Sequence, residues 1–396
     1  MSQRNVTHTT VGIVGGGPAG LMLSHLLSLS GIDSVVVDNR TRLEIEQTVR
    51  AGILERDSVR LLVDTVSDRV LSEGQEHAGI ELAFGGGGHR IDFQDLVGES
   101  VWLYPQTAVF IDLADARARV DGDVRFGVRD TSVVDITSAR PGILFTDADD
   151  VEQEIRCDYL VGADGSRSIC RHAIPETERR QFFREYPFAW FGILCEAPTS
   201  APELIYNHCE RGFALISQRT ETLQRMYFQC DPEEDVNAWS EDRIWAELQA
   251  RVGSNGYTLK EGPIIDKSVL RFRSFVNEPM RYGNLLLAGD AAHTVPPTGA
   301  KGLNLALADV RVLADILERA VHKGDNETLH EYTDLALARV WKSQHFSYWM
   351  TTMLHSLPES TGFDVRRQIG ELASVVGSRA GSTFLAEAYT GWPTSG

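Results

Sequence analysis

A hydrophobic strand that runs into a glycine-rich turn and then a helix is the feature that most constrains this chain. Val11–Val14 is apolar, and Gly15, Gly17 and Gly20 follow in the pattern G-x-G-x-x-G. The first glycine makes the turn, the second lets backbone approach a pyrophosphate, and the third lets helix pack on strand. The apolar residues of Pro18–Ser30 predict that helix, whose amino terminus favours phosphate. We therefore predict a doubly wound α/β nucleotide-binding domain.

Three strands of this domain are expected to end at an acid. Asp38 follows the predicted strand Ser34–Val37, about where a carboxylate meets a ribose hydroxyl. Asp164 and Asp290 follow two later apolar runs, each next to a glycine. NAD, NADP and FAD all use the glycine pattern, and a lone aspartate at a strand end is more often a turn or cap residue. The three motifs together favour FAD, with Asp290 accepting a hydrogen bond from a ribityl hydroxyl.

The segment after Asp290 is a small-residue loop that enters a helix predicted over Leu305–Ala320. A helix amino terminus aimed at the flavin would stabilise its anionic reduced form.

The middle of the chain predicts paired strands, since apolar residues alternate over 203–230. Ser217 and Arg219 are two residues apart and share one face of their strand. Arginine suits a flat carboxylate because its fork donates two parallel hydrogen bonds. Two plainer interpretations are a surface ion pair for Arg219 and core packing for Tyr227.

Composition excludes several classes of function. The formal net charge of −18 argues against nucleic-acid binding. No apolar run approaches the roughly 20 residues of a membrane span, and the polar first ten residues do not resemble a signal peptide. The five cysteines lack metal or disulfide spacing, so we expect reduced thiols, a cytoplasmic location and no metal. The run Gly85–Gly88 predicts a hairpin turn, because no helix follows it.

Several stretches resemble the class A flavin-dependent aromatic hydroxylases, and within them the branch that acts on 4-hydroxybenzoate. The strand-end motifs belong to the whole superfamily, whereas Ser217–Arg219 and Pro296–Asn304 are more specific. Further matching stretches are Arg50–Glu55, Tyr186–Trp190, Glu203–Tyr206 and Arg211–Ile216.

This resemblance implies an enzyme with tightly bound, non-covalent FAD that consumes dioxygen and NADPH or NADH. Oxygen transfer from a flavin hydroperoxide would convert 4-hydroxybenzoate to 3,4-dihydroxybenzoate in aromatic compound degradation. The ring reacts faster as phenolate, so the site must remove a phenolic proton at neutral pH. The family uses a tyrosine pair leading to a surface histidine, which Tyr206, Tyr389 and His77 match. Without the resemblance, His77 would be an ordinary loop residue.

The resemblance also assigns the remaining site residues. Arg219, Ser217 and Tyr227 would bind the carboxylate, Pro297 would face the substrate hydroxyl, and Arg225 would influence flavin position. The expected FAD contacts are Gly15, Gly17, Pro18, Ala19, Gly20, Asp38, Arg50, Gln106, Asp164, Asp290, Pro297, Gly299, Lys301, Gly302, Leu303 and Asn304. The expected NAD(P)H cleft comprises Arg50, Arg167 and Arg273.

We expect a discontinuous FAD-binding domain (1–75, 107–180 and 276–345) with an inserted mixed-sheet substrate domain (76–106 and 181–275). A helical C-terminal part (346–396) would close the pocket with Tyr389, and the family suggests a homodimer. The segment after Asp38 departs from the family: Glu44 and Glu46 would repel a 2′-phosphate, whereas Arg40 and Arg42 could attract one. Two alternatives stay open. One is a hydroxylase of a related benzoate, such as 4-aminobenzoate, and the other is a flavin-binding sensor or subunit without hydroxylase activity.

Overall fold

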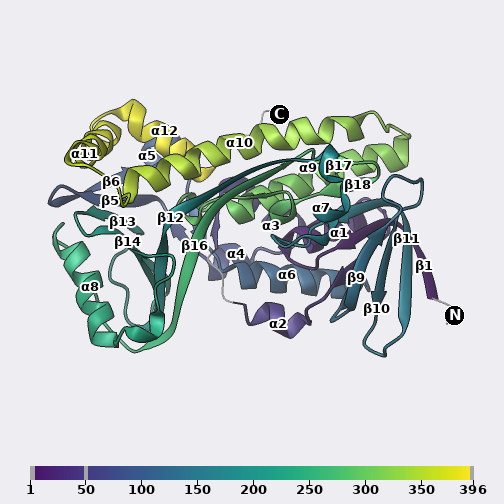
Figure 1. Cartoon of the computed structure of the whole chain (residues 1–396), viewed down its shortest axis with the longest axis horizontal. Coiled ribbons are helices and arrows are strands. Elements are labelled where there is room, and N and C mark those ends of the chain that lie inside the picture. Colours follow the sequence, from purple (N-terminus) through teal and green to yellow (C-terminus); the bar gives the residue numbers. More distant parts are fainter. Residues whose placement is uncertain (1–4, 49–51, 393–396) are drawn as a thin grey trace.

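The chain is described by a computed structural model that places residues 5–48 and 52–392 (Figure 1). In these residues the strands form three sheets. The first sheet has the order β17-β18-β11-β1-β2-β8, with β9 and β10 added beside β11. Its strands are β1 (Asn5–Val14), β2 (Ser34–Asp38), β8 (Asp123–Phe126), β9 (Arg129–Val134), β10 (Gly142–Thr146), β11 (Glu152–Gly162), β17 (Arg281–Tyr282) and β18 (Leu285–Leu287).

Parallel pairing brings together strand ends that are far apart in the sequence. Val14, Gly162 and Leu287 occupy neighbouring positions at the carboxyl ends of β1, β11 and β18. Backbone hydrogen bonds continue the alignment past these ends, from the Ala163 amide to Val14 and from the Ala288 amide to Gly162. The three motifs predicted from the sequence therefore lie at one edge of one sheet, where ligands of doubly wound folds bind.

Helices pack on this sheet and extend beyond it. α1 contacts both α6 and α9, and its apolar side chains join the core that includes Val11, Ile13 and Val36. The helices of the chain are α1 (Pro18–Leu29), α2 (Arg42–Glu46), α3 (Arg56–Thr65), α4 (Arg69–Glu73), α5 (Phe93–Val97), α6 (Gln106–Arg119), α7 (Ile169–Ala173), α8 (Glu241–Gly253), α9 (Gly302–Lys323), α10 (Thr328–Leu354), α11 (Gly362–Val376) and α12 (Arg379–Thr390).

The second sheet has the order β19-β16-β12-β15-β14-β13-β5-β6. Its strands are β5 (Gly79–Phe84), β6 (Gly87–Asp92), β12 (Arg180–Glu196), β13 (Ile205–Cys209), β14 (Gly212–Thr220), β15 (Leu223–Cys230), β16 (Ile264–Glu278) and β19 (His293–Thr294). The predicted pairing within 203–230 is confirmed, and the four-glycine run is a hairpin turn between β5 and β6.

Each face of this second sheet has its own core. One face packs on α8 through residues such as Ile216 and Met226. The opposite face, which includes Leu215 and Tyr227, packs on α10, α11 and α12. The period of two along a strand explains this division, since successive side chains point to opposite faces.

Two long strands of this second sheet, β12 and β16, pair antiparallel over most of their length and extend towards the first sheet (Figure 1). A small sheet of β3 (Ile53–Leu54), β7 (Val101–Leu103) and β4 (Gln75–His77) completes the sheet structure of the described residues. The fold class predicted from the sequence, α/β with mixed sheets and a helical C-terminal part, is confirmed. The helix after the small-residue loop begins at Gly302 and ends at Lys323, so its predicted extent was too short at both ends.

Candidate active site

The glycine loop after β1 is shaped by two close backbone contacts and one open position. Gly15 has φ +109°, and a Cβ there would lie 2.2 Å from the Ala163 carbonyl oxygen. A Cβ on Gly20 would lie 1.9 Å from the Gly15 carbonyl oxygen, so only glycine lets α1 pack this closely. Gly17, by contrast, precedes Pro18 at the amino end of α1 and has no neighbouring atom within 4 Å of such a Cβ. This open position fits the backbone approach of a diphosphate.

The carboxylates of the three strand-end acids, Asp38, Asp164 and Asp290, differ in the hydrogen bonds that they accept from the protein. Asp38 accepts hydrogen bonds from the Gly16 amide and the Arg40 amide, both at 2.8 Å. Asp164 caps the start of α7 through the Ser168 hydroxyl and the Cys170 amide. Asp290 is half-buried, and among the described residues its carboxylate has no hydrogen-bond donor and no ion pair. Its free oxygens fit the hydroxyl groups of FAD.

In the small-residue loop before α9, the two long polar side chains, Lys301 and Asn304, are occupied by contacts within the protein. Lys301 is fully buried, where its ammonium pairs with Glu55 at 2.6 Å and donates to the Tyr389 carbonyl oxygen. The Asn304 amide donates to the Ile53 and Ala300 carbonyl oxygens and accepts from the Glu55 amide. These two side chains thus hold the loop together, and any contact with a cofactor falls to the backbone.

Four further expected FAD residues lie in or next to this loop. Gly299 is buried, and a Cβ there would lie 2.9 Å from the Ser347 hydroxyl oxygen. Gly302, the first residue of α9, faces open space, while Leu303 is half-buried. Pro297 is half-buried, and its carbonyl oxygen already accepts a hydrogen bond from the Ala300 amide. The loop therefore leaves room beside the amino end of a long helix.

The Arg219 guanidinium has no anionic partner among residues 5–48 and 52–392. It lies on β14, and among the described residues it forms no ion pair, while its buried Nε has no hydrogen-bond acceptor. Burial lowers the pKa of Arg219, and the Tyr227 hydroxyl lies beside it. The neighbouring Arg225 is paired with Asp266 at 3.0 Å and donates to the Tyr227 hydroxyl at 3.3 Å. The Ser217 side chain is buried on the same strand as Arg219.

Tyr206 and Tyr389 meet next to this cation-bearing strand. Their hydroxyl oxygens are 2.6 Å apart, and both side chains are buried. The Tyr206 hydroxyl can also donate to the Thr298 carbonyl oxygen at 3.3 Å. Burial raises the pKa of both tyrosines, so both hydroxyls stay protonated near neutral pH. Such a pair can pass a proton by exchanging donor and acceptor roles.

His77 is buried, whereas the family resemblance implied a histidine at the surface. Its side chain is only 2 % exposed, and burial lowers its pKa to about 4. The Gln218 amide nitrogen lies 3.0 Å from Nε2 of His77 and also donates to the Pro202 carbonyl oxygen. No hydrogen bond joins His77 to Tyr389 in the described residues. The expectation failed because the exposure of His77 depends on the packing of β4 beside β14, which local sequence does not encode.

The residues expected in the coenzyme cleft, and the expected flavin neighbour Gln106, take no part in the hydrogen bonds described above. Arg50 lies outside the described residues. Arg167 is exposed just before α7, and Arg273 is exposed on β16. Gln106 is the half-buried first residue of α6.

The sequence did not predict the buried pair of Asp309 and His293, which lies beside Gly289, just after the carboxyl end of β18. Oδ2 of Asp309 lies 2.7 Å from Nε2 of His293 and accepts from the Gly289 amide at 2.9 Å. Asp309 follows the acid motif by 19 residues inside an apolar helix pattern, and a charge at such a position was the signal that could have found it.

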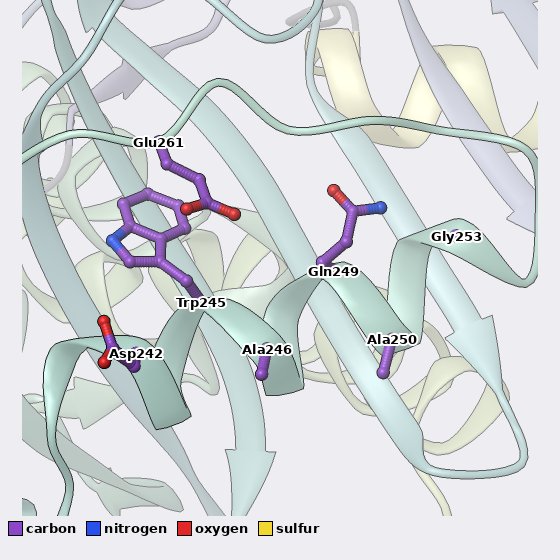
Figure 2. A pocket seen from close by; sticks show the side chains of 7 residues that line it. All are labelled: Asp242, Trp245, Ala246, Gln249, Ala250, Gly253 and Glu261. Atoms are coloured by element: carbon purple, nitrogen blue, oxygen red, sulfur yellow. The ribbon is translucent and has the colours of Figure 1, made fainter.

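A groove of about 640 Å³ lies elsewhere, along α8 (Figure 2). Its lining includes two acids, Asp242 and Glu261, and the small residues Ala246, Ala250 and Gly253. It contains no cation that could bind an acid, and it lies on the side of the substrate sheet opposite the tyrosine pair. The groove therefore lacks the positive charge that an aromatic acid would need.

A doubly wound domain with an open glycine loop at the amino end of a helix is typical of dinucleotide-binding oxidoreductases. Comparisons with known proteins agree. Residues 8–347 match the FAD binding domain family. The chain is 42% identical over 388 residues to p-hydroxybenzoate hydroxylase of Acinetobacter baylyi, covering 97% of this chain and 96% of that protein. The chain belongs to the FAD-dependent aromatic hydroxylases, and FAD is its cofactor.

More distant relatives share the fold. A 3-(3-hydroxy-phenyl)propionate/3-hydroxycinnamic acid hydroxylase of Burkholderia vietnamiensis is 27% identical over 81% of this chain and 59% of its own length. The crystal structure of p-nitrophenol 4-monooxygenase from Pseudomonas putida superposes with a TM-score of 0.80 at 18% identity, covering 98% of this chain and 100% of that chain. No helix within residues 5–48 and 52–392 has the length and apolar character needed to cross a membrane.

Proposed function

We propose that this hydroxylase converts 4-hydroxybenzoate, dioxygen and NAD(P)H to 3,4-dihydroxybenzoate, water and NAD(P)⁺. The observation that carries the proposal is Arg219, whose buried Nε has no hydrogen-bond acceptor and which forms no ion pair in the part of the chain that the structure describes. A benzoate carboxylate would supply that anion and accept two parallel hydrogen bonds. The relative of the same length with 42% identity, named for p-hydroxybenzoate, supports the same substrate.

The residues of this chain would divide the work as follows. Arg219 binds the carboxylate, with the hydroxyls of Ser217 and Tyr227 as further donors, which fixes the ring in one orientation. The opposite end of the ring then faces the Tyr206 hydroxyl, which accepts the phenolic proton as it donates its own. Tyr389, 2.6 Å away, would accept that proton at its hydroxyl oxygen and at the same time pass its own proton on to water.

The buried aromatic rings beside the tyrosines, such as Phe213 and Trp190, would exclude water from the reaction. When bound, FAD supplies the activated oxygen atom. Gly17, Asp290 and the backbone of Gly299–Gly302 would hold it, beside the amino end of α9. Asp309, which is paired with His293, fixes the turn at Gly289 by accepting a hydrogen bond from the Gly289 amide.

The charged residues after Asp38 support NADH as a coenzyme at least as good as NADPH. Arg40 pairs with Asp38, and Arg42 pairs with Glu46 at 2.6 Å and with Asp115 at 2.5 Å. A 2′-phosphate would have to displace these carboxylates. We expect kcat/KM for NADH to equal or exceed that for NADPH, and a clear preference for NADPH would contradict this assignment.

We also propose a cytoplasmic homodimer and the division into domains given by the sequence. The oligomeric state is measured by analytical ultracentrifugation of the FAD-loaded protein.

One assay tests the reaction. The FAD-loaded protein is mixed with NADH or NADPH in air, with one of a panel of benzoates, and hydroxylated product is quantified alongside coenzyme oxidation. We expect 3,4-dihydroxybenzoate in a yield equal to the coenzyme consumed. Coenzyme oxidation that yields only hydrogen peroxide, or faster product formation from 4-aminobenzoate, would overturn the proposed substrate.

A further inference from the structure

His355, the residue after the carboxyl end of α10, is fully buried within a cluster of aromatic rings. Its imidazole stacks on Phe188, with centroids 4.6 Å apart and planes within 6°. Phe213, Phe272 and Trp190 surround it at centroid distances of 4.4, 5.5 and 6.0 Å. A polar ring in such surroundings is costly unless each nitrogen has a hydrogen-bond partner.

Both imidazole nitrogens of His355 are paired, and the partners set its tautomer. The Trp190 indole can only donate, so its Nε1–H donates to Nε2 of His355 at 2.7 Å. Nδ1 must then carry the proton, which it donates to the Thr351 carbonyl oxygen at 2.8 Å. Burial lowers the pKa of His355 to about 3, so the imidazole stays neutral.

Trp190 connects this histidine to the acid-binding residues. Its ring lies 4.8 Å from the ring of Tyr227, at an angle of 40°. The Tyr227 hydroxyl lies beside Arg219. A continuous series of contacts thus runs from the end of α10, through His355, Trp190 and Tyr227, to the unpaired guanidinium.

We propose that His355 is a positioning residue for the substrate carboxylate. By accepting the indole N–H, it fixes Trp190, and Trp190 in turn holds Tyr227 beside Arg219. The carboxyl end of α10 thereby sets the geometry in which the aromatic acid is bound. This inference rests on the proposed function, which supplies the acid.

The chain offers a matched control for a purely structural role. His208, on β13, is also buried, and its Nδ1 lies 2.9 Å from the Leu354 carbonyl oxygen. Both histidines therefore hold the same helix end, but only His355 contacts the Trp190 N–H. Loosening of α10 alone should affect variants of both residues, whereas release of Trp190 should affect only His355 variants.

The test compares five variants of the full-length, FAD-loaded protein: His355→Leu, His355→Gln, Trp190→Phe, the double variant His355→Leu/Trp190→Phe, and His208→Leu. The dissociation constant of 4-hydroxybenzoate is measured by titrating the flavin absorbance, and kcat is measured at saturating substrate. We expect His355→Leu to raise the dissociation constant about tenfold with little change in kcat, because a buried indole N–H loses its acceptor. His355→Gln, which offers an amide oxygen, should recover most of this loss.

The double variant decides between positioning and general damage. Phenylalanine needs no acceptor, so His355→Leu should cost less in the Trp190→Phe background than in the parent. Equal effects of His355→Leu and His208→Leu, or additive effects in the double variant, would overturn the inference.

A second measurement does not depend on substrate. Near-ultraviolet circular dichroism should lose the same tryptophan band in His355→Leu as in Trp190→Phe, and an unchanged band would also overturn the inference. If the parent itself fails to bind 4-hydroxybenzoate, the proposed function fails, and the dichroism alone decides the role of His355. Should His355→Leu not fold, His355→Asn, whose side chain is too short to reach the indole, replaces it in every comparison.

Discussion

The hydroxyl oxygens of Tyr206 and Tyr389 lie 2.6 Å apart although 183 residues separate them in the chain. Tyr206 comes from the substrate sheet and Tyr389 from the last helix, α12. Closure of the C-terminal helices over the sheet therefore assembles this pair. An isolated substrate sheet would lack the second hydroxyl, and with it the route for the phenolic proton.

Replacing Tyr389 with phenylalanine should leave substrate binding nearly intact but slow hydroxylation. Removing a proton acceptor from such a pair typically costs about a hundredfold in rate. The ionisation of bound 4-hydroxybenzoate is followed by its ultraviolet absorbance as a function of pH, and it should shift to higher pH in Tyr389→Phe. Tyr332→Phe is the control, because its hydroxyl donates to the Leu287 carbonyl oxygen in the cofactor domain. An equal loss in the control would argue against a role for the pair in proton transfer.

Arg219→Ala should weaken the binding of 4-hydroxybenzoate by about 3 kcal/mol, since removing one partner of a desolvated charge pair costs roughly that much. Titration of the flavin absorbance gives the dissociation constant. Arg129→Ala removes an exposed arginine that pairs with Asp150 and should leave the constant unchanged. An unaltered dissociation constant in Arg219→Ala would end its assignment as the carboxylate-binding residue.

Gly17 and Gly20, two glycines of the G-x-G-x-x-G motif, should respond differently to substitution by alanine. Gly20→Ala places a Cβ 1.9 Å from the Gly15 carbonyl oxygen, so we expect a loss of about 3 kcal/mol in folding stability. Gly17→Ala meets no protein atom and should fold normally, yet bind FAD at least tenfold more weakly. Thermal unfolding of the apoprotein and a flavin fluorescence titration separate the two effects. Gly370→Ala, in α11, should leave FAD binding unchanged, and a normal FAD affinity in Gly17→Ala would refute the loop as the diphosphate site.

The buried His293–Asp309 pair makes stability depend on pH. Burial opposes a charged imidazole, but the Asp309 carboxylate outweighs it, and the pKa of His293 is raised. The folded state then binds the proton more tightly than the unfolded chain. This contribution is fully present below the unfolded pKa of about 6.5 and is lost as pH rises through the folded value. Denaturant unfolding at a series of pH values should show that decline in the parent and not in His293→Gln; a similar decline in both proteins would point to other groups.

Local patterns were sufficient to predict the cofactor domain. The glycine spacing and the acids at Asp38, Asp164 and Asp290 follow their strands directly, and parallel pairing then brings the strand ends to one edge. The alternation around Ser217 likewise predicted the substrate sheet. In each case the information lies within a few residues of the position predicted.

Exposure and side-chain pairing could not be predicted in the same way. His77 was expected at the surface because the family resemblance implies a surface histidine, but its side chain is buried and its Nε2 lies 3.0 Å from the Gln218 amide nitrogen. The ion pair between the Lys301 ammonium and Glu55, 246 residues away along the chain, could not be predicted from local sequence. The proposed role of His355 depends on Trp190, 165 residues away along the chain. These features arise only from long-range packing.

The continuous strands β12 and β16 have a consequence for engineering. Both strands cross the proposed domain boundaries at 180/181 and 275/276, so paired strands, not loops, join the two proposed domains there. Grafting the substrate domain of another hydroxylase onto this chain would require new junctions in both β12 and β16 that preserve their pairing. Changes of specificity in this protein are therefore better sought by altering side chains in place than by exchanging modules.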